Sequence, residues 1–364
     1  MVRERNRTTR RAQAPRAIPP QVTRNPTRTV IVDPEAPDTR VIEDAARVLR
    51  DGGLVAFPTE TVYGLGARGL DPAAVARIFA AKGRPSTHPL ILHVAGEEDA
   101  RLLAATWCDR ASRLARAFWP GPLTLVVPRG AHVPASVAGG GTSIALRAPA
   151  HPVARALIVA LGEPIAAPSA NRYQSLSPTT AEHVRKSLEG RIELIVDGGA
   201  CSAGIESTVV DVRFDVATIL RPGALDLASI RAVLPDIRVD AGATVVAEDA
   251  LRASPGMDAR HYAPRAPLFV VEGRTETVRV AHARAAAGAR VGLVLRGDAA
   301  PTDLAIEVFV LADDPVAYAY GLFATLHALD DAGVEAVVVE AVPGDERWWA
   351  VADRLRRASA VVPE

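Results

Sequence analysis

The chain has 364 residues, of which 42 are basic and 42 are acidic, so its formal net charge is zero. This length predicts about two domains, and the neutral balance excludes a general electrostatic attraction to nucleic acid or to a membrane surface. No apolar run approaches the ~18 residues that cross a bilayer, so no membrane partner is expected.

Residues 1–28 form a basic arm with eight arginines, one glutamate and four prolines and no hydrophobic periodicity. This composition predicts disorder, because it offers too little apolar surface to build a core. We interpret the arm as a solvated tail or an over-extended start of the chain. A weak contact with RNA is the alternative.

The two cysteines, Cys108 and Cys201, lie outside any C-x-x-C pattern. They cannot build a zinc knuckle, and they argue against a disulfide scaffold. A reducing, cytoplasmic location fits this usage best.

Strands and helices alternate from residue 29 onward, which predicts an α/β fold. Strands are predicted at residues 29–32, 54–57, 89–94, 123–127, 143–147, 165–167, 192–196, 209–212 and 218–220. Helices are predicted at residues 38–51, 72–82, 97–105, 109–118, 151–161 and 180–188. The helix at 72–82 has the clearest limits, because Asp71 is a favourable N-cap, Pro72 suits the first turn and Gly83 suits the C-terminal end.

The segment between the strand at 54–57 and this helix is predicted to be an irregular turn. Gly64, Gly66 and Gly69 match G-x-G-x-x-G, the dinucleotide-binding fingerprint. However, the helix begins after the last of these glycines. In addition, a proline and several polar residues separate the strand from the first glycine. The context therefore argues against a dinucleotide site.

Hydroxyl, amide or arginine side chains follow several of the predicted strands. In open α/β sheets, ligands bind at the carboxyl ends of the strands. Lys82 and Arg84 add two cations just ahead of the strand at 89–94. The pattern predicts a small-molecule site that takes an anion.

The pattern fades over residues 236–267, which we interpret as a linker. Beyond it, strands are predicted at residues 268–271, 291–295, 306–311 and 336–340, and helices at 276–287, 315–329 and 346–358. This alternation predicts a smaller, Rossmann-like α/β domain over residues 268–364.

Four segments in order resemble the YrdC-like domain of L-threonylcarbamoyladenylate synthases. They are PTETVYGLG at 58–66, Lys82 and Arg84 ahead of Pro89-Leu90, APSAN at 167–171 and ESTVV at 206–210. SPGM at 254–257 and HYAP at 261–264, followed by an α/β domain, resemble the two-domain form of that enzyme. The resemblance implies a catalytic domain with a large twisted mixed sheet at 29–235, and a linker at 236–267 that closes over the site as a lid.

The resemblance also implies the reaction. L-threonine, bicarbonate or CO2, and ATP would give threonylcarbamoyl-AMP and pyrophosphate, and a tRNA threonylcarbamoyl transferase would use the product. Because the reacting carbamate and phosphate are both anions, catalysis would consist mainly of positioning and charge neutralisation. Mg²⁺ would enter with ATP and be held mainly by the phosphates, so no metal site built from protein ligands is expected.

Residue roles carry over by position in the motifs. Lys82 and Arg84 are the candidate catalytic cations. The threonine-side contacts are Thr61, His93, Arg147, Ala167 and Ser207. The ATP-side contacts are Arg84, His88, Ser143, Ser169, Asn171, Ser177 and Arg221.

Taken singly, these residues have ordinary explanations. Arg147 or Arg221 alone indicates an ion pair, His93 a satisfied core histidine and Ser177 a helix cap. Their joint occurrence in four ordered motifs favours the site. Two positions depart from the family pattern: His88 stands where relatives often carry Asn or Lys, and Ala259 stands where some carry tyrosine.

Two other functions remain open at this point. One is a double-stranded RNA or tRNA-binding module without adenylation activity, which the neutral charge disfavours. The other is a carbamoyltransferase, whose zinc-finger-like segments two cysteines cannot build.

Overall fold

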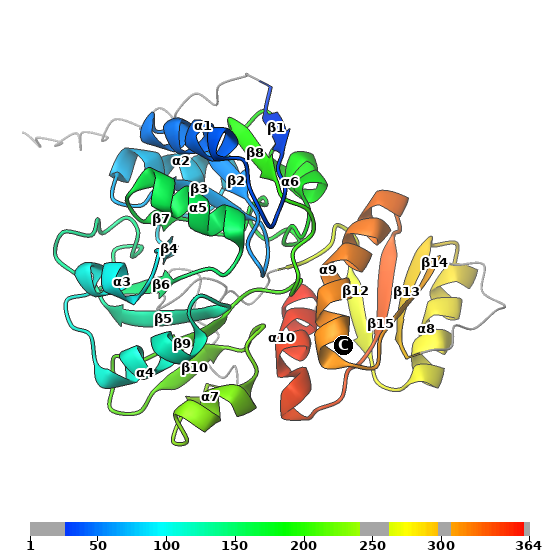
Figure 1. The fold of residues 1–364 in the computed structure, drawn as a ribbon. Helices are drawn as coiled ribbons and strands as arrows, with labels where there is room; N and C mark the ends of the chain where they lie inside the picture. Colours follow the sequence, from blue (N-terminus) through cyan, green and yellow to red (C-terminus); the bar gives the residue numbers. More distant parts are fainter. Residues whose placement is uncertain (1–25, 241–261, 298–306, 360–364) are drawn as a thin grey trace, which may run out of the picture.

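The computed structural model describes residues 26–240, 262–297 and 307–359, and these residues form two sheets covered by helices (Figure 1). The larger sheet is mixed and has eleven strands in the order β1-β8-β2-β3-β7-β4-β6-β5-β9-β10-β11. The smaller sheet has four parallel strands in the order β12-β15-β13-β14. This confirms the predicted fold class of a large mixed sheet joined to a smaller α/β unit.

The strands of the larger sheet are β1 (Arg28–Ile31), β2 (Val55–Phe57), β3 (Gly64–Arg68), β4 (Ile91–His93), β5 (Leu123–Pro128), β6 (Ser143–Arg147), β7 (Ile165–Ala166), β8 (Leu194–Asp197), β9 (Thr208–Asp211), β10 (Thr218–Arg221) and β11 (Arg238–Val239). The helices of the same part are α1 (Thr39–Arg50), α2 (Pro72–Lys82), α3 (Glu97–Leu103), α4 (Asp109–Phe118), α5 (Pro152–Leu161), α6 (Ala181–Leu188) and α7 (Leu227–Val233). The smaller unit contains β12 (Leu268–Val271), α8 (Arg274–Ala286), β13 (Val291–Arg296), β14 (Glu307–Leu311), α9 (Pro315–Ala332), β15 (Ala336–Glu340), a 3₁₀ turn (Glu346–Trp348) and α10 (Trp349–Ala358).

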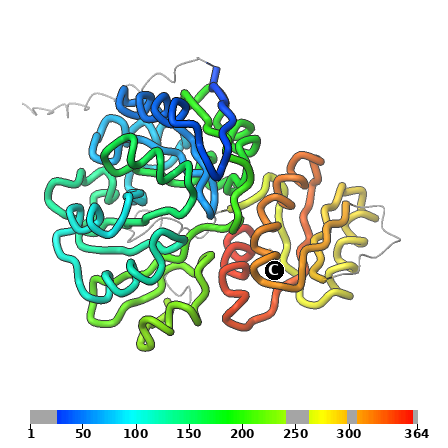
Figure 2. Tube along the Cα trace, in the orientation of Figure 1, coloured from blue at the N-terminus to red at the C-terminus, as the bar shows by residue number. Residues whose placement is uncertain are grey.

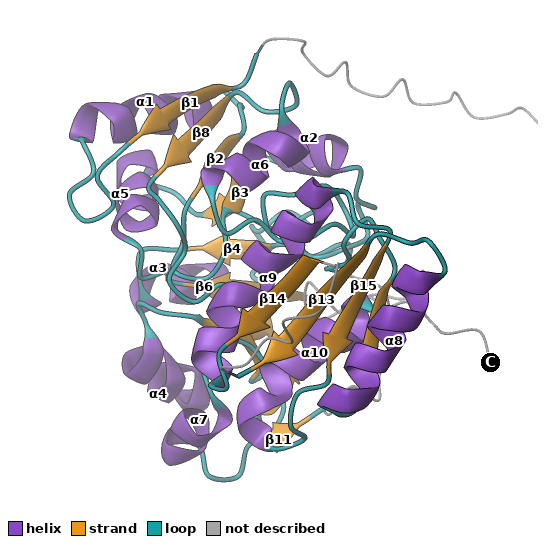
Figure 3. Cartoon of the chain, turned by 90° about the vertical axis from the view of Figure 1, so that its right-hand side faces the viewer, coloured by secondary structure: helices purple, strands orange, loops and turns teal. Residues whose placement is uncertain are grey.

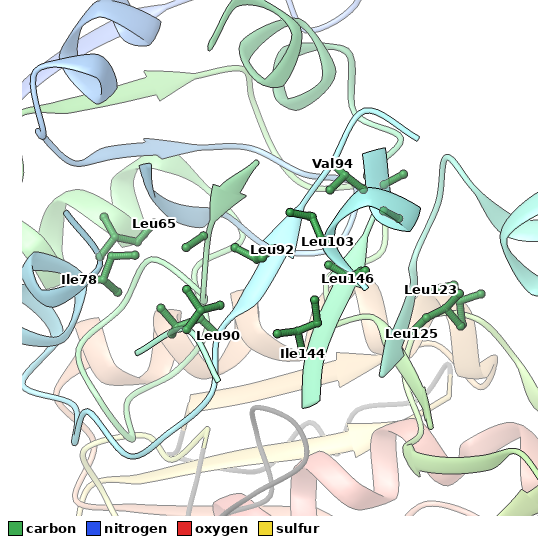
Figure 4. Close-up of a cluster of buried hydrophobic side chains, with 14 of the residues drawn as sticks. Leu65, Ile78, Leu90, Leu92, Val94, Leu103, Leu123, Leu125, Ile144 and Leu146 are labelled. Atoms are coloured by element: carbon green, nitrogen blue, oxygen red, sulfur yellow. The ribbon is translucent and has the colours of Figure 1, made fainter. Parts of the chain in front are cut away.

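Alternation along the central strands gives the larger sheet two different faces. Leu90 and Leu92 around β4, with Ile144 and Leu146 of β6, point into the main hydrophobic core, which Figure 4 shows in close-up. The alternate residues of the same strands, which include His93 and Arg147, point to the opposite face. The opposite face carries a small apolar cluster that includes Ile91 and Ala145, and also the polar side chains of His93 and Arg147.

The smaller sheet is sandwiched between helices. On one face, Leu293, Leu295 and Val338 pack with Ala281 of α8. On the other face, Val337 and Val339 pack with the apolar sides of α9 and α10. Figures 1 and 3 show α8 on one side of this sheet and α9 and α10 on the other, so the last two helices lie between the two sheets.

The two parts of the chain share one buried cluster. Val62, Leu176 and Ile205 of the first part belong to the same hydrophobic cluster as Phe323 of α9 and Leu355 of α10. The tube in Figure 2 shows the red C-terminal helix lying directly against the first part of the chain. Because apolar surface is buried across this contact, the C-terminal unit is packed against the first part of the chain and not merely tethered to it.

The segment predicted to be an irregular turn contains β3 instead. Its residues pair antiparallel with β2 and with β7. A Cβ on Gly66 would lie 2.8 Å from a ring carbon of Phe57, so this glycine permits close packing inside the sheet. The prediction of a turn was therefore wrong. Two further elements, α7 and β11, were not predicted. Strand β11 lies inside the predicted linker and pairs with β10.

Most of the predicted linker and lid lies outside the described residues. This includes SPGM at 254–257, Ala259 and His261. Tyr262 and Ala263 are described and buried. Within the ranges that the structure describes, no helix has the length and apolarity that membrane crossing requires.

Candidate active site

A polar cleft lies on the face of the larger sheet opposite the main core. About 530 Å³ of space lies within it, a figure that includes open solvent. Its lining comes from segments far apart in the chain: Thr59, Thr61, Val62, Tyr63, Gly64, Arg84, Ile91, His93, Arg147, Ala167, Pro168, Ser169, Glu206, Ser207, Arg221 and Tyr262.

The structure brings most of the predicted site residues to this cleft. The predicted threonine-side residues all line it: Thr61, His93, Arg147, Ala167 and Ser207. Arg84, Ser169 and Arg221 of the predicted ATP side also line it. However, β7 runs antiparallel to β4, whereas β6 runs parallel to it. The carboxyl end of β7 therefore points in the direction opposite to those of β4 and β6. The expectation that the ligand site is formed by the carboxyl ends of the strands does not hold for β7, and the cleft extends across a face of the sheet.

The loop after β2 is shaped by its threonine hydroxyls. Thr59 Oγ1 accepts the backbone N–H groups of Thr61 at 3.2 Å and Val62 at 3.3 Å, and lies 2.6 Å from the Val62 carbonyl. The two threonine hydroxyls lie 2.8 Å apart. This compact turn holds Thr61 Oγ1 toward the end of β6.

Arg147 is the cation at the end of β6. Its Nη1 donates to Thr61 Oγ1 at 2.9 Å, and its Nη2 lies 2.7 Å from Glu60 Oε1. The side chain is 5% exposed, so this ion pair is largely shielded from water. Arg147 thus keeps a planar donor surface in the cleft, with Glu60 as its counter-charge.

His93 lies beside Arg147, because β4 and β6 pair in parallel with these two residues in register. Burial and the positive charge of Arg147 lower the pKa of His93 to about 3. The imidazole is therefore neutral at physiological pH, and it can bind a substrate without adding charge.

A second cation, Arg221, ends β10. Its Nη2 donates to the Ser207 carbonyl at 2.9 Å and to Ser207 Oγ at 3.2 Å, and its Nη1 lies 3.5 Å from the Tyr262 hydroxyl. Ser207 Oγ also lies 2.8 Å from Thr124 Oγ1 of β5. Burial lowers the pKa of Arg221, yet arginine starts so high that it stays charged.

The helix α2 delivers Lys82 and Arg84 to the site. Asp71 caps its start by accepting the N–H of Ala73 at 2.8 Å, and Gly83 ends it in the left-handed conformation with φ of 68°. That turn sends Arg84 into the cleft, where its Nη2 donates to the Pro89 carbonyl at 3.1 Å.

Lys82 does not line the cleft; it lies behind it. Its Nζ is 2.6 Å from the carbonyls of Ser169 and Asn171 and 3.3 Å from Asn171 Oδ1. Burial and the charge of Arg84 lower its pKa well below the ordinary value, whereas three acceptor oxygens match the three N–H donors of the protonated amine. Lys82 therefore fixes the loop that presents Ser169.

Four other predicted ATP-side residues also lie outside the cleft lining. Asn171 Oδ1 accepts from Ser169 Oγ at 2.6 Å, and His88 is buried edge-on against the ring of Tyr173. Ser143 is buried at the start of β6. Ser177 Oγ donates to Glu206 Oε1 at 2.5 Å.

Thr59, Glu206 and Tyr262 are among the cleft residues that were not predicted as site residues. Each stands inside a motif that carried the resemblance, so position in the motif was the available signal. Glu206 is notable because it is a carboxylate among cations. Its Oε2 accepts from Arg354 Nε of α10 at 2.7 Å, a contact that the sequence separation of 148 residues conceals.

Comparison with protein families gives two matches that together span most of the chain. A model of the Sua5, YciO and YrdC proteins, described as "Telomere recombination", matches residues 47–223. A model described as "Threonylcarbamoyl-AMP synthase, C-terminal domain" matches residues 225–360.

Individual proteins agree with these matches. The threonylcarbamoyl-AMP synthase of Pyrococcus abyssi is 45% identical over 323 residues, 87% of this chain and 94% of that protein. The Bacillus subtilis protein of the same name is 40% identical over 322 residues, 87% of this chain and 92% of that protein. A crystal structure of P. abyssi Sua5 complexed with L-threonine is similar with a TM-score of 0.85 and 42% identity, and covers 92% of this chain and 98% of that one.

Proposed function

The chain belongs to the threonylcarbamoyl-AMP synthase family, and from this premise we propose that its cleft holds L-threonine and ATP next to each other. The enzyme makes threonylcarbamoyl-AMP for threonylcarbamoyladenosine modification of tRNA. The observation that carries the proposal is the joint lining of one cleft by Arg84, Arg147 and Arg221, because the chemistry must bring two anions together.

The threonine subsite is proposed at Arg147. The L-threonine complex of the P. abyssi relative supports an amino-acid site in this fold. The planar guanidinium of Arg147 suits a carboxylate, which it can bind through two parallel N–H donors. Thr61, His93, Ala167 and Ser207 surround that position, and neutral His93 accepts or donates a hydrogen bond without repelling the substrate amine.

ATP is proposed to extend from the threonine subsite along β6. Ser143 and Arg147 are four residues apart on this strand, so they share a face and lie roughly 13 Å apart. This separation suits a substrate with a triphosphate at one end and a nucleobase at the other. Arg84, Ser169 and Arg221 would bind the phosphates, while Lys82 and Asn171 would hold the loop that carries Ser169.

The proposed chemistry needs no covalent nucleophile from the protein. The threonine amine attacks CO2 and releases a proton to give a carbamate. A carbamate oxygen then attacks the α-phosphorus, the bond from this phosphorus to the bridging oxygen breaks, and pyrophosphate leaves with the electron pair of that bond. Buried arginines lower the repulsion between the carbamate and the triphosphate, and fixed geometry brings the reacting oxygen in line. The enzyme therefore works by positioning and charge compensation.

Mg²⁺ is proposed to arrive with ATP and to supply additional charge neutralisation at the phosphates. Within the described ranges no group of three His, Cys, Asp or Glu side chains can hold a metal ion. The carboxylates near the cleft are already paired, Glu60 with Arg147 and Glu206 with Arg354. This donor set fits a cation held mainly by phosphate and water.

Pyrophosphate release from ATP tests this function. With Mg²⁺ present, we expect release that requires both L-threonine and bicarbonate, and mass spectrometry should detect threonylcarbamoyl-AMP. Release that ignores threonine would contradict the proposal, and so would tRNA binding without any release. We further propose that a tRNA threonylcarbamoyl transferase consumes the product, which a coupled assay with tRNA would detect.

A further inference from the structure

Arg354 connects the C-terminal unit to the cleft. It lies on α10, and its side chain is only 1% exposed. Its Nε donates to Glu206 Oε2 at 2.7 Å, and its Nη1 donates to the Pro222 carbonyl at 2.9 Å. A single side chain of the C-terminal unit therefore contacts both the segment before β9 and the segment after β10.

Glu206, the partner of Arg354, belongs to the cleft itself. It lines the cleft directly before Ser207, and its other oxygen accepts from Ser177 Oγ at 2.5 Å. The carbonyl of Ser177 is in turn 3.1 Å from Nε2 of His327 on α9. Both oxygens of the carboxylate are thus held, one by the first part of the chain and one by the C-terminal unit.

Tyr262 provides a second connection. The Arg354 guanidinium lies over its ring at 5.1 Å from the centroid, a geometry that attracts the cation to the ring face. The Tyr262 hydroxyl is 3.5 Å from Arg221 Nη1, and Arg221 holds Ser207. Tyr262, Arg221 and Ser207 all line the cleft.

Charge is the reason that these contacts matter. A site that takes a carbamate and a triphosphate is weakened by an uncompensated carboxylate in its wall. Arg354 also contacts Asp353 at 3.1 Å, but Asp353 keeps two other cations, Arg356 and Arg357. Without Arg354, the carboxylate that loses its ion-pair partner is therefore Glu206.

We propose that Arg354 is a positioning residue of the synthase, through which the C-terminal unit neutralises Glu206 and orients the wall formed by Glu206, Ser207 and Tyr262. This inference rests on the proposed function of the cleft. It assigns to the C-terminal unit a part in substrate affinity, although Arg354 does not itself line the cleft.

The alternative is a purely structural role, in which Arg354 only stabilises the fold. Removing one partner of a buried ion pair destabilises a protein, because the other charge is left buried and unpaired. The two roles differ in kinetics. Loss of stability lowers the active fraction and hence the apparent kcat, whereas an uncompensated carboxylate weakens the binding of anions and raises KM and Kd.

The test compares the full-length wild type with Arg354→Met, Arg354→Gln and the double variant Arg354→Met/Glu206→Gln. Arg356→Met is the matched control, because Arg356 lies on the same helix and pairs with Asp353 but has an exposed side chain outside the cleft. Circular dichroism establishes folding, calorimetry gives the Kd of ATP in MgCl2, and pyrophosphate release gives KM and kcat.

We expect Arg354→Met to raise the Kd and KM for ATP about tenfold, and the added Glu206→Gln to recover at least about threefold of that loss. Arg356→Met should match the wild type. If Arg354→Met does not fold, Arg354→Gln carries the test, because it keeps an N–H donor but not the charge and should show the same rise.

Unchanged ATP affinity in a folded Arg354 variant would overturn the proposal, as would an equal rise in the Arg356 control or no recovery in the double variant. The calorimetric arm does not depend on turnover. A wild type that binds ATP without threonine-dependent pyrophosphate release would contradict the proposed function, while the Kd ratio would still decide the role of Arg354.

Discussion

Replacing Arg147 with methionine should strongly weaken threonine binding while leaving most ATP binding in place. Methionine fills much of the same space but removes the donors that now contact Thr61 at 2.9 Å and Glu60 at 2.7 Å. A hydrogen bond to a charged group contributes about 1.5–3 kcal/mol, so a two-bond contact with the threonine carboxylate is worth about 3 kcal/mol at the lower end. That loss corresponds to roughly a hundredfold higher Kd for L-threonine.

Glu60 adds to this effect, because the variant leaves its carboxylate beside the incoming carboxylate of threonine. The second substitution Glu60→Gln, made in the Arg147→Met background, should therefore recover part of the affinity. Calorimetric titration with L-threonine measures both variants. The expected order of affinity is wild type, then the double variant, then Arg147→Met.

The matched control for this prediction is Arg68→Met. Arg68 also pairs with a glutamate, Glu163 at 2.5 Å, but it lies on β3 outside the cleft and its side chain is about one-third exposed. We expect this variant to bind threonine like the wild type, since exposed pairs contribute only about 0–1 kcal/mol to stability. A folded Arg147→Met variant with threonine affinity within about threefold of the wild type would refute the assignment.

Three further outcomes are expected. Lys82→Met should lower the free energy of unfolding by about 3 kcal/mol, because the buried carbonyls of Ser169 and Asn171 lose their donor; urea denaturation measures this, and an unchanged midpoint would contradict it. Burial holds the pKa of His327 at about 4, so between pH 6.5 and 4 the unfolded chain binds more protons and stability falls as pH falls, by about 2 kcal/mol at pH 5. The variant His327→Gln should therefore show a smaller difference in the free energy of unfolding between pH 7 and pH 5 than the wild type. An equal difference in both proteins would contradict this role of the histidine. EDTA should abolish pyrophosphate release and excess Mg²⁺ should restore it; full turnover in EDTA would contradict delivery of the cation with ATP.

Sequence signals sufficed where the determinants of structure are local. The helix α2 begins and ends as predicted, because Asp71, Pro72 and Gly83 act on their immediate neighbours. The strand β3 was missed for the opposite reason. Gly66 is a glycine because Phe57 of the neighbouring strand packs against it, and that contact is not visible in the local pattern.

The site shows the same division. The family resemblance identified Arg147, Ser207 and Arg221, which line the cleft. The motif also singled out Lys82, but its partners lie 87 and 89 residues further along the chain, so sequence could not show that it faces the loop and not the cleft. Arg354 carries no sequence signal of its own, since its importance arises only from the packing of α10 against the first part of the chain.

The choice of cation follows from burial. Burial of the side chains in the cleft wall strengthens the attraction between protein and substrate charges, but the same desolvation disfavours the charged form of the basic groups. Lysine loses charge readily under these conditions, and Lys82 shows that direction. The guanidinium group of arginine does not lose its proton in proteins. The buried side chains of Arg84, Arg147 and Arg221 therefore supply the positive charge. A cleft lined by arginines, with the nearby Lys82 turned toward backbone carbonyls, can therefore keep its positive charge although these side chains are buried. By the same reasoning a carboxylate in the wall must have its own cation, and Glu206 obtains it from the C-terminal unit.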